Sequence, residues 1–185
     1  MRRRLAIAAL AGLLLGFSYT HVLWLLTIFL LAVFIRQLHG VSCRQRLILS
    51  LTFFASYWLI VINWIYVLGP LPYLLLTVVC LLPYAIVAIP SKQYSITFAT
   101  TIVIAEFIHS EFPWGGFPWG LMAYTQTHSS IAQMSRIGGQ YLVTFIVVVL
   151  ATNVARPFRF KSWIGIAFVA GVVGLLNLLL PSRIG

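Results

Sequence analysis

Long apolar runs, separated by short polar or charged breaks, make up most of this chain. The runs cover residues 5–35, 47–68, 72–89, 94–111, 135–155 and 162–180. Most are long enough for an α-helix that crosses a bilayer core of about 30 Å, because a helix rises about 1.5 Å per residue. The pattern predicts an all-α fold, a polytopic transmembrane helix bundle that forms a single domain over 1–185. Pro83 is expected to kink the helix over 72–89.

The first run, 5–35, is too long for one ordinary span and short for two, since two helices of about 15 residues reach only about 22 Å each. Charge favours two. If 5–35 is a hairpin that turns near Ser18 to His21, ten cations share one side of the membrane, against Arg136 and Arg183 opposite; a single span gives seven against five. Positive residues concentrate on the cytoplasmic side. We therefore predict about seven spans, with a cytoplasmic N-terminus and an external C-terminus: the hairpin, three spans over 47–111 and two over 135–180.

A cleaved signal peptide is the alternative for the N-terminus. Three arginines precede the first apolar run, and Gly16-Phe17-Ser18 has the small-x-small spacing of a cleavage site. The apolar run resumes at once after this site, which favours a membrane anchor. Ala8, Gly12 and Gly16 recur every four residues, and we expect this spacing to let the two helices of the hairpin approach closely.

The connection over 112–134 is the one long break between apolar runs. Its start repeats Phe-Pro-Trp-Gly, at 112–115 and 117–120, and this density of proline and glycine excludes a continuous helix. Aromatic side chains without charged neighbours suit the boundary between lipid and water. We predict an ordered interfacial loop on the outer side, and we expect the functional site there.

Five short motifs lie in order along residues 63–145. They are Asn63-Trp64-Ile65-Tyr66-Val67, Glu106-Phe107-Ile108, Gly116-Phe117-Pro118-Trp119, Ala123-Tyr124-Thr125-Gln126 and Ile137-Gly138-Gly139, followed by Tyr141 and Phe145. In order and spacing they resemble the membrane domain of bacterial apolipoprotein N-acyltransferase. The chain departs from that pattern at His109, where an arginine is usual, and it stops where the family's nitrilase-type catalytic domain would begin.

The resemblance implies a multi-pass protein of the bacterial inner membrane that takes part in lipoprotein biosynthesis. The family transfers an acyl chain from phospholipid to the amino group of the diacylglyceryl-cysteine of a lipoprotein, through a thioester on a Glu-Lys-Cys triad. The partners implied are phospholipid, a diacylated lipoprotein and a nitrilase-type domain, separately encoded if this chain lacks one. The alternative is a non-catalytic membrane scaffold or lipid-binding subunit. A transporter is less favoured, because no inverted repeat is visible.

No catalytic residues are expected on this chain itself. Cys43 is predicted in a cytoplasmic loop, Cys80 inside a span, and Lys92 and Lys161 on the inner side, so the family's triad cannot assemble. A serine triad of the usual kind is excluded because the chain has no aspartate. The two cysteines lack metal-ligand spacing, and we expect no metal, cofactor or disulfide.

Composition agrees with a membrane protein. With 62% hydrophobic and 8% charged residues, the chain has too little polar surface for a soluble globule. The net charge of +10 does not indicate nucleic-acid binding, because the cations form short clusters between apolar runs, as membrane topology requires.

Candidate lipid-binding residues come from the long loop and its surroundings. Glu106 and His109 share one helix face near the outer end of 94–111; Glu106 is expected to pair with His109 or Arg136, either to hold the loop or to contact a phospholipid headgroup. The aromatic loop residues could line a groove for acyl chains or anchor the loop at the membrane interface. The upstream residues Asn63 and Trp64 could tie two helices together or contact substrate. The remaining candidates are Phe117, Pro118, Trp119, Tyr124, Gln126, Asn63 and Trp64.

Overall fold

A computed structural model describes residues 1–21, 23–90, 95–113 and 115–156, together with positions 167, 170–171 and 174–175. Within this part of the chain every regular element is helical, which confirms the predicted all-α fold. The α-helices are α1 (Arg2–Thr20), α2 (Trp24–Gln37), α3 (Cys43–Val61), α4 (Pro70–Leu81), α5 (Ser95–Glu111) and α6 (Ser135–Val154). Short 3-10 helices connect or extend them: η1 (Asn63–Leu68), η2 (Leu82–Ala88), η3 (Met122–Gln126) and η4 (Ser130–Met134).

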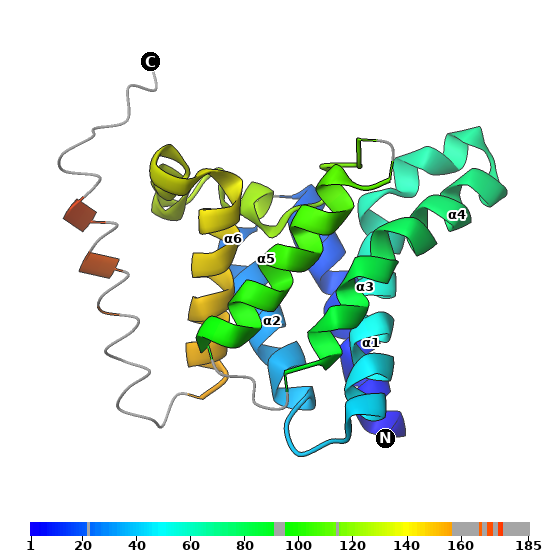
Figure 1. Ribbon diagram of the computed structural model, residues 1–185, viewed down its shortest axis with the longest axis horizontal. Helices are drawn as coiled ribbons and strands as arrows, with labels where there is room; N and C mark the ends of the chain where they lie inside the picture. The colour runs from blue at the N-terminus through cyan, green and yellow to red at the C-terminus, as the bar shows by residue number, and fades with distance from the viewer. Residues whose placement is uncertain are drawn as a thin grey trace.

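The helices α1, α2, α3, α5 and α6 run side by side, whereas η1 and α4 project sideways from one end of the bundle (Figure 1). The turn between η1 and α4 lies at Gly69, whose φ of 111° is a conformation that glycine readily adopts, and Pro70 then occupies the first position of α4. The α-helix changes to 3-10 geometry at Leu82, beside Pro83. This change lies where proline, which lacks a backbone N–H, is expected to disturb the helix.

The apolar run 5–35 folds as two helices, α1 and α2, joined at His21 to Leu23. The hydroxyl of Ser18 fixes this connection, because it donates to the Leu23 carbonyl at 2.7 Å and lies 3.0 Å from the Thr27 hydroxyl. The close helix approach, however, is not between these two helices. A Cβ on Gly12 would overlap the Phe53 carbonyl oxygen, so the glycine face of α1 packs against α3.

The same holds one turn further along α1. A Cβ on Gly16 would lie 2.6 Å from the Cβ of Ile60 on α3. The small-residue spacing was predicted to bring α1 close to α2. This prediction is wrong, because the glycines lie against α3. Small residues at four-residue spacing indicate a helix face that another helix backbone can approach closely, but they do not indicate which helix that is.

An aromatic core fills the space between α2, α3 and η2. The rings of Phe34 and Phe53 stack with centroids 4.0 Å apart, and those of Phe54 and Tyr84 with centroids 3.9 Å apart. All four side chains are fully buried, as is Trp58, one turn further along α3. The core thus extends along α3 toward the end where the long loop folds back.

Two helical stretches in the described part of the chain are long and apolar enough to cross a membrane, Pro70–Ala88 and Ser130–Val154. The helix α2 has 14 residues, and α1 and α3 carry arginines in their first turn. The predicted last span, 162–180, lies outside the described residues apart from five isolated positions. The number of seven spans stays a prediction.

Candidate functional site

The loop 112–134 has an exposed first part and a buried second part. Phe112, Pro118 and Trp119 are exposed, whereas Leu121 and Met122 are fully buried. The buried part forms η3 and η4 and packs between α1, α2 and α6. The exposure expected of an interfacial loop is thus found mainly at its beginning, and again at Thr127, His128 and Ser130.

Glu106 holds the start of η3. Its side chain is fully buried in α5, and its Oε1 accepts a hydrogen bond from the Met122 N–H at 2.7 Å. The next N–H, of Ala123, donates to the hydroxyl of Thr144 on α6 at 3.1 Å. The first N–H groups of a helix have no acceptor within the helix. Glu106 and Thr144 supply these acceptors and so fix η3 to α5 and α6.

His109 holds the exposed part of the loop. Its Nε2 lies 3.0 Å from the Trp119 carbonyl oxygen, which requires the proton on Nε2, and its own backbone carbonyl accepts the Phe117 N–H at 2.9 Å. The ring packs edge-on against Trp58, with centroids 5.1 Å apart. The predicted pairing of Glu106 with His109 is wrong, because each of these side chains binds a backbone group of the loop.

Gly120 lies where the exposed and buried parts of the loop meet. Its carbonyl accepts the Tyr57 hydroxyl at 2.7 Å, and its N–H donates to the Tyr19 hydroxyl at 3.3 Å. Its φ is 71°, and a Cβ would lie 2.6 Å from the Trp58 ring. Glycine is thus required here both by backbone conformation and by the close approach of α3.

Gln126 and Tyr124 act as ties within the site. The buried Gln126 donates from Nε2 to the Trp24 carbonyl at 3.3 Å and accepts at Oε1 from the Ser129 hydroxyl at 3.0 Å. The half-buried Tyr124 hydroxyl lies 3.0 Å from Oε1 of Gln140 and 3.2 Å from the Pro118 carbonyl. Burial, and then the nearby Glu106, raise the pKa of this phenol.

The exposed candidates form an aromatic surface. The rings of Trp64, in η1, and Trp119 meet edge to face with centroids 6.0 Å apart, and the two side chains are 54% and 45% exposed. Phe117 is partly buried, with its ring centroid 6.5 Å from that of Trp119. Asn63, at the start of η1, is exposed. The structure thus brings the upstream motif and the loop motif together.

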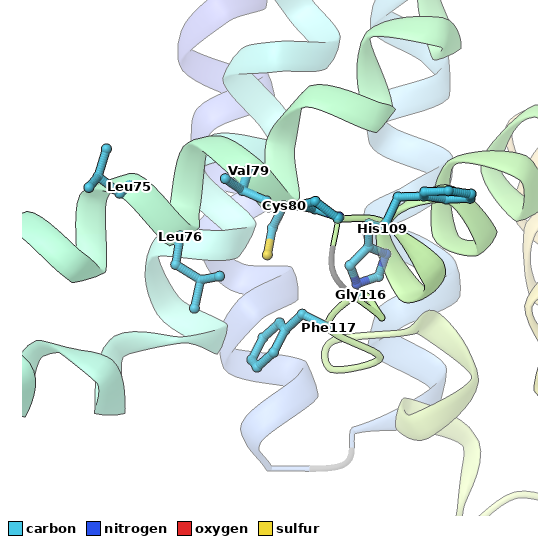
Figure 2. A pocket seen from close by; sticks show the side chains of 9 residues that line it. Leu75, Leu76, Val79, Cys80, His109, Gly116 and Phe117 are labelled. Carbon is cyan, nitrogen blue, oxygen red and sulfur yellow. The ribbon is translucent and has the colours of Figure 1, made fainter.

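A cavity of about 360 Å³ lies beside this surface, between α4, the end of α5 and the loop. In Figure 2 the Cys80 sulfur and the side chains of Leu76 and Phe117 converge on it. Leu75 and Phe112 are exposed at its rim. The complete lining is Leu75, Leu76, Val79, Cys80, His109, Phe112, Pro113, Gly116 and Phe117.

Sequence reasoning did not single out the α4 side of this cavity. Leu75, Leu76 and Val79 belong to a uniformly apolar helix, so no periodicity marks the face that they form. Within the described part of the chain, no group of three His, Cys, Asp or Glu side chains could hold a metal ion. Cys43 is exposed and Cys80 buried, and both are free thiols.

The arrangement defines a helical membrane domain whose long loop is folded onto one end of the bundle, next to an apolar cavity. Residues 11–153 match the family described as the apolipoprotein N-acyltransferase N-terminal domain. Since this match covers more than half of the chain, the protein belongs to that family. Among curated proteins, no match to the chain is found.

Proposed function

We propose that this chain is the membrane module of a lipoprotein N-acylation system and that its apolar cavity holds an acyl chain of the phospholipid donor or of the lipoprotein's diacylglyceryl anchor. The cavity carries the proposal. Its volume of about 360 Å³ lies within the range of ligand pockets, roughly 300–1,000 Å³. Its lining contains no Lys, Arg, Asp or Glu, and Nε2 of the one histidine, His109, is engaged by the Trp119 carbonyl.

The aromatic surface supports the same proposal. Trp64 and Trp119 are half exposed next to the cavity, and indole rings favour the boundary between lipid tails and water. A lipid with one chain in the cavity would have its headgroup near these rings. In this proposal Glu106 is a positioning residue, because it holds the loop and is not part of the cavity lining, whereas His109 both holds the loop and lines the cavity.

The acyl-transfer chemistry itself is assigned to a nitrilase-type domain. Cys80 is buried and Cys43 is exposed at the first position of α3, and both lysines, Lys92 and Lys161, lie outside the described residues. Thioester formation requires a thiolate activated by neighbouring groups. This module would present the lipids, and the nitrilase-type domain would carry the acyl group.

The location proposed is the bacterial inner membrane, with seven spans, a cytoplasmic N-terminus and an external C-terminus. The ten-to-two division of cations supports it. Alkaline phosphatase fused after Gly185 should be active, and the same enzyme inserted in the loop 38–42 should be inactive. The reverse pattern would refute both the orientation and the external position of the loop.

Acyl transfer from labelled phospholipid to a diacylated lipopeptide tests the function, with and without an added nitrilase-type domain. Activity should require that domain and should fall in Leu76→Trp, which fills the cavity. The matched control is Leu74→Trp, on the same helix but outside the cavity. A phospholipid with a photoreactive group at the end of its acyl chain should label the cavity lining in the parent and less in Leu76→Trp.

A non-catalytic lipid-binding scaffold is the second candidate. It is favoured by one observation: the buried polar residues of the site, Glu106, His109 and Gln126, all bind groups of the loop or of neighbouring helices. Photolabelling of the cavity without transfer in the presence of any nitrilase-type domain would support the scaffold. Transfer by this chain alone, surviving alanine at both cysteines, would overturn the mechanism proposed here.

A further inference from the structure

Four basic side chains converge at the end of the bundle opposite the loop. They are Arg4 in the first turn of α1, Arg36 at the end of α2, His39 in the following turn, and Arg156 just after α6. Figure 1 shows the N-terminus and the ends of α2 and α6 at the same end of the molecule. The guanidinium of Arg4 bonds the His39 carbonyl at 2.8 Å, and Nη2 of Arg156 lies 3.4 Å from Nε2 of His39. We call these four residues the basic cluster.

Side-chain carboxylates do not neutralise the basic cluster. The chain has two acidic residues, Glu106 and Glu111, and both lie in the last turns of α5, at the loop end of the bundle. The charges of the cluster therefore reinforce one another. Burial, and then the charges of Arg156, Arg36 and Arg4, lower the pKa of His39, which indicates that all three guanidinium groups act on one imidazole.

The donors of the cluster are held in place before any ligand arrives. Nη1 of Arg4 donates to the carbonyls of Gln37 and His39, the acceptors that the end of α2 leaves open. This use of one nitrogen fixes the guanidinium plane and leaves Nε and Nη2 for another acceptor. Arg36, three residues before His39 in the sequence, is exposed. Arginine forks suit the oxygens of a phosphate because two parallel N–H groups can bind two oxygens.

Exposed apolar side chains lie directly along the helix from Arg36. Val33 and Phe29 are three and seven residues before it, so the three share one face of α2. Val33 is 38% and Phe29 55% exposed. A ligand with its phosphate at Arg36 thus meets an apolar helix surface where acyl chains would lie. Free phosphate would gain nothing from this surface.

We infer that the basic cluster binds the phosphate of an anionic phospholipid in the membrane leaflet at this end of the bundle. Basic pockets between helices at an anionic leaflet recognise headgroups in this way. The inference is independent of acyl transfer, since the cluster and the lipid cavity lie at opposite ends of the bundle. Loss of one would leave the other intact.

Binding of three short-chain or inorganic probes to the full chain in detergent tests the inference. Dihexanoylphosphatidylglycerol should bind more tightly than dihexanoylphosphatidylcholine and than inorganic phosphate, as measured by titration calorimetry. Arg36→Gln should weaken binding of the anionic lipid about fivefold, since a basic residue near an anionic surface contributes about 1 kcal/mol. Arg36→Lys should retain most of the affinity.

Arg44→Gln is the matched control. Arg44 is exposed, lies in the first turn of α3 at the same end of the bundle and carries the same charge, but it is not among the charges that act on His39. It should change the dissociation constant by less than about twofold, because exposed charges outside a site are screened. Equal weakening by the two glutamine variants, or equal affinity for the zwitterionic lipid, would overturn the inference. Equal affinity for inorganic phosphate would refute a lipid ligand.

Discussion

Replacement of Glu106 by methionine or by glutamine separates two explanations of why a carboxyl group is buried in α5. The Oε1 of Glu106 accepts the Met122 N–H at 2.7 Å, and both residues are fully buried. Methionine has a similar length but no strong acceptor, so this N–H would lose its hydrogen bond. A buried unpaired donor costs about 1–3 kcal/mol in water-soluble proteins. Membrane helices show smaller values, about 0.6 on average and up to about 1.7.

Glutamine keeps a carbonyl oxygen at the same distance along the side chain. Its amide replaces Oε2, for which the described structure shows no hydrogen bond. A neutral amide also avoids the free energy of burying a carboxylate. The two amide N–H groups would lack an acceptor at this position, which offsets part of that gain. We therefore expect the free energy of unfolding of Glu106→Gln to be close to that of the parent, and that of Glu106→Met to be lower by about 1–2 kcal/mol.

Unfolding in mixed detergent micelles measures this difference, and chymotrypsin reports on the loop itself. Tyr124 lies in η3, the segment that Glu106 holds, so Glu106→Met should be cut faster there. Thr144→Val, which removes the acceptor of the next N–H, should behave like Glu106→Met. Thr100→Val is the control on α5, because Thr100 is exposed and bonds only the carbonyl of Ile96.

Two results would refute this reasoning. If Glu106→Gln is as unstable as Glu106→Met, the negative charge contributes to stability, and the need for a hydrogen-bond acceptor alone does not explain the carboxyl group at position 106. If Glu106→Met matches the parent in stability and in cleavage rate, Glu106 does not hold the loop.

Three further predictions concern packing and pH. Gly12→Ala should lower the free energy of unfolding by about 1–3 kcal/mol, since its Cβ overlaps the Phe53 carbonyl, and detergent unfolding measures it. Gly120→Ala should lower it similarly, because φ is positive and the Trp58 ring is too close, and should speed loop cleavage. The lowered pKa of His39 means that the unfolded chain binds more protons just below the ordinary value of 6.5. The contribution of neutral His39 to the free energy of unfolding is therefore complete above pH 6.5 and is lost as the pH falls from 6.5 through the lower pKa of the folded state. His39→Gln should make the free energy of unfolding depend less on pH in this range.

Much of the helical layout could be predicted from the sequence. Apolar runs of this length fold as helices, and the breaks at Gly69 and near Pro83 are local effects of glycine and proline on the backbone. The repeated Phe-Pro-Trp-Gly marked the segment that folds back at one end of the bundle. Such features depend on neighbours in the sequence, and the sequence contains that information directly.

The contacts between distant segments could not be predicted in the same way. Gly12 and Gly16 signalled a close backbone approach, but α3 rather than α2 lies against them, because helix packing in three dimensions selects the neighbour. Glu106 was expected to bind a charged side chain, yet it binds a backbone N–H that is exposed by the start of η3. The cavity needs Leu76 and Cys80 to face the loop, and a uniformly apolar helix gives no sign of that orientation.

Three charged groups of the described residues, Glu106, Arg4 and Arg46, follow one physical rule: each bonds a backbone group at the end of a helix. Glu106 accepts from an N–H at the start of η3, whereas Arg4 and Arg46 donate to carbonyls at the ends of α2 and η2. The carboxylate of Glu106 thus lies where a helix leaves an N–H group unpaired, and the two guanidinium groups lie where helices leave carbonyls unpaired. In a chain with two acidic residues, pairing charges with backbone satisfies more buried groups than pairing them with one another. It also fixes the loop without placing charge on its lipid-facing side, so the apolar cavity and the tryptophan pair stay suited to lipid.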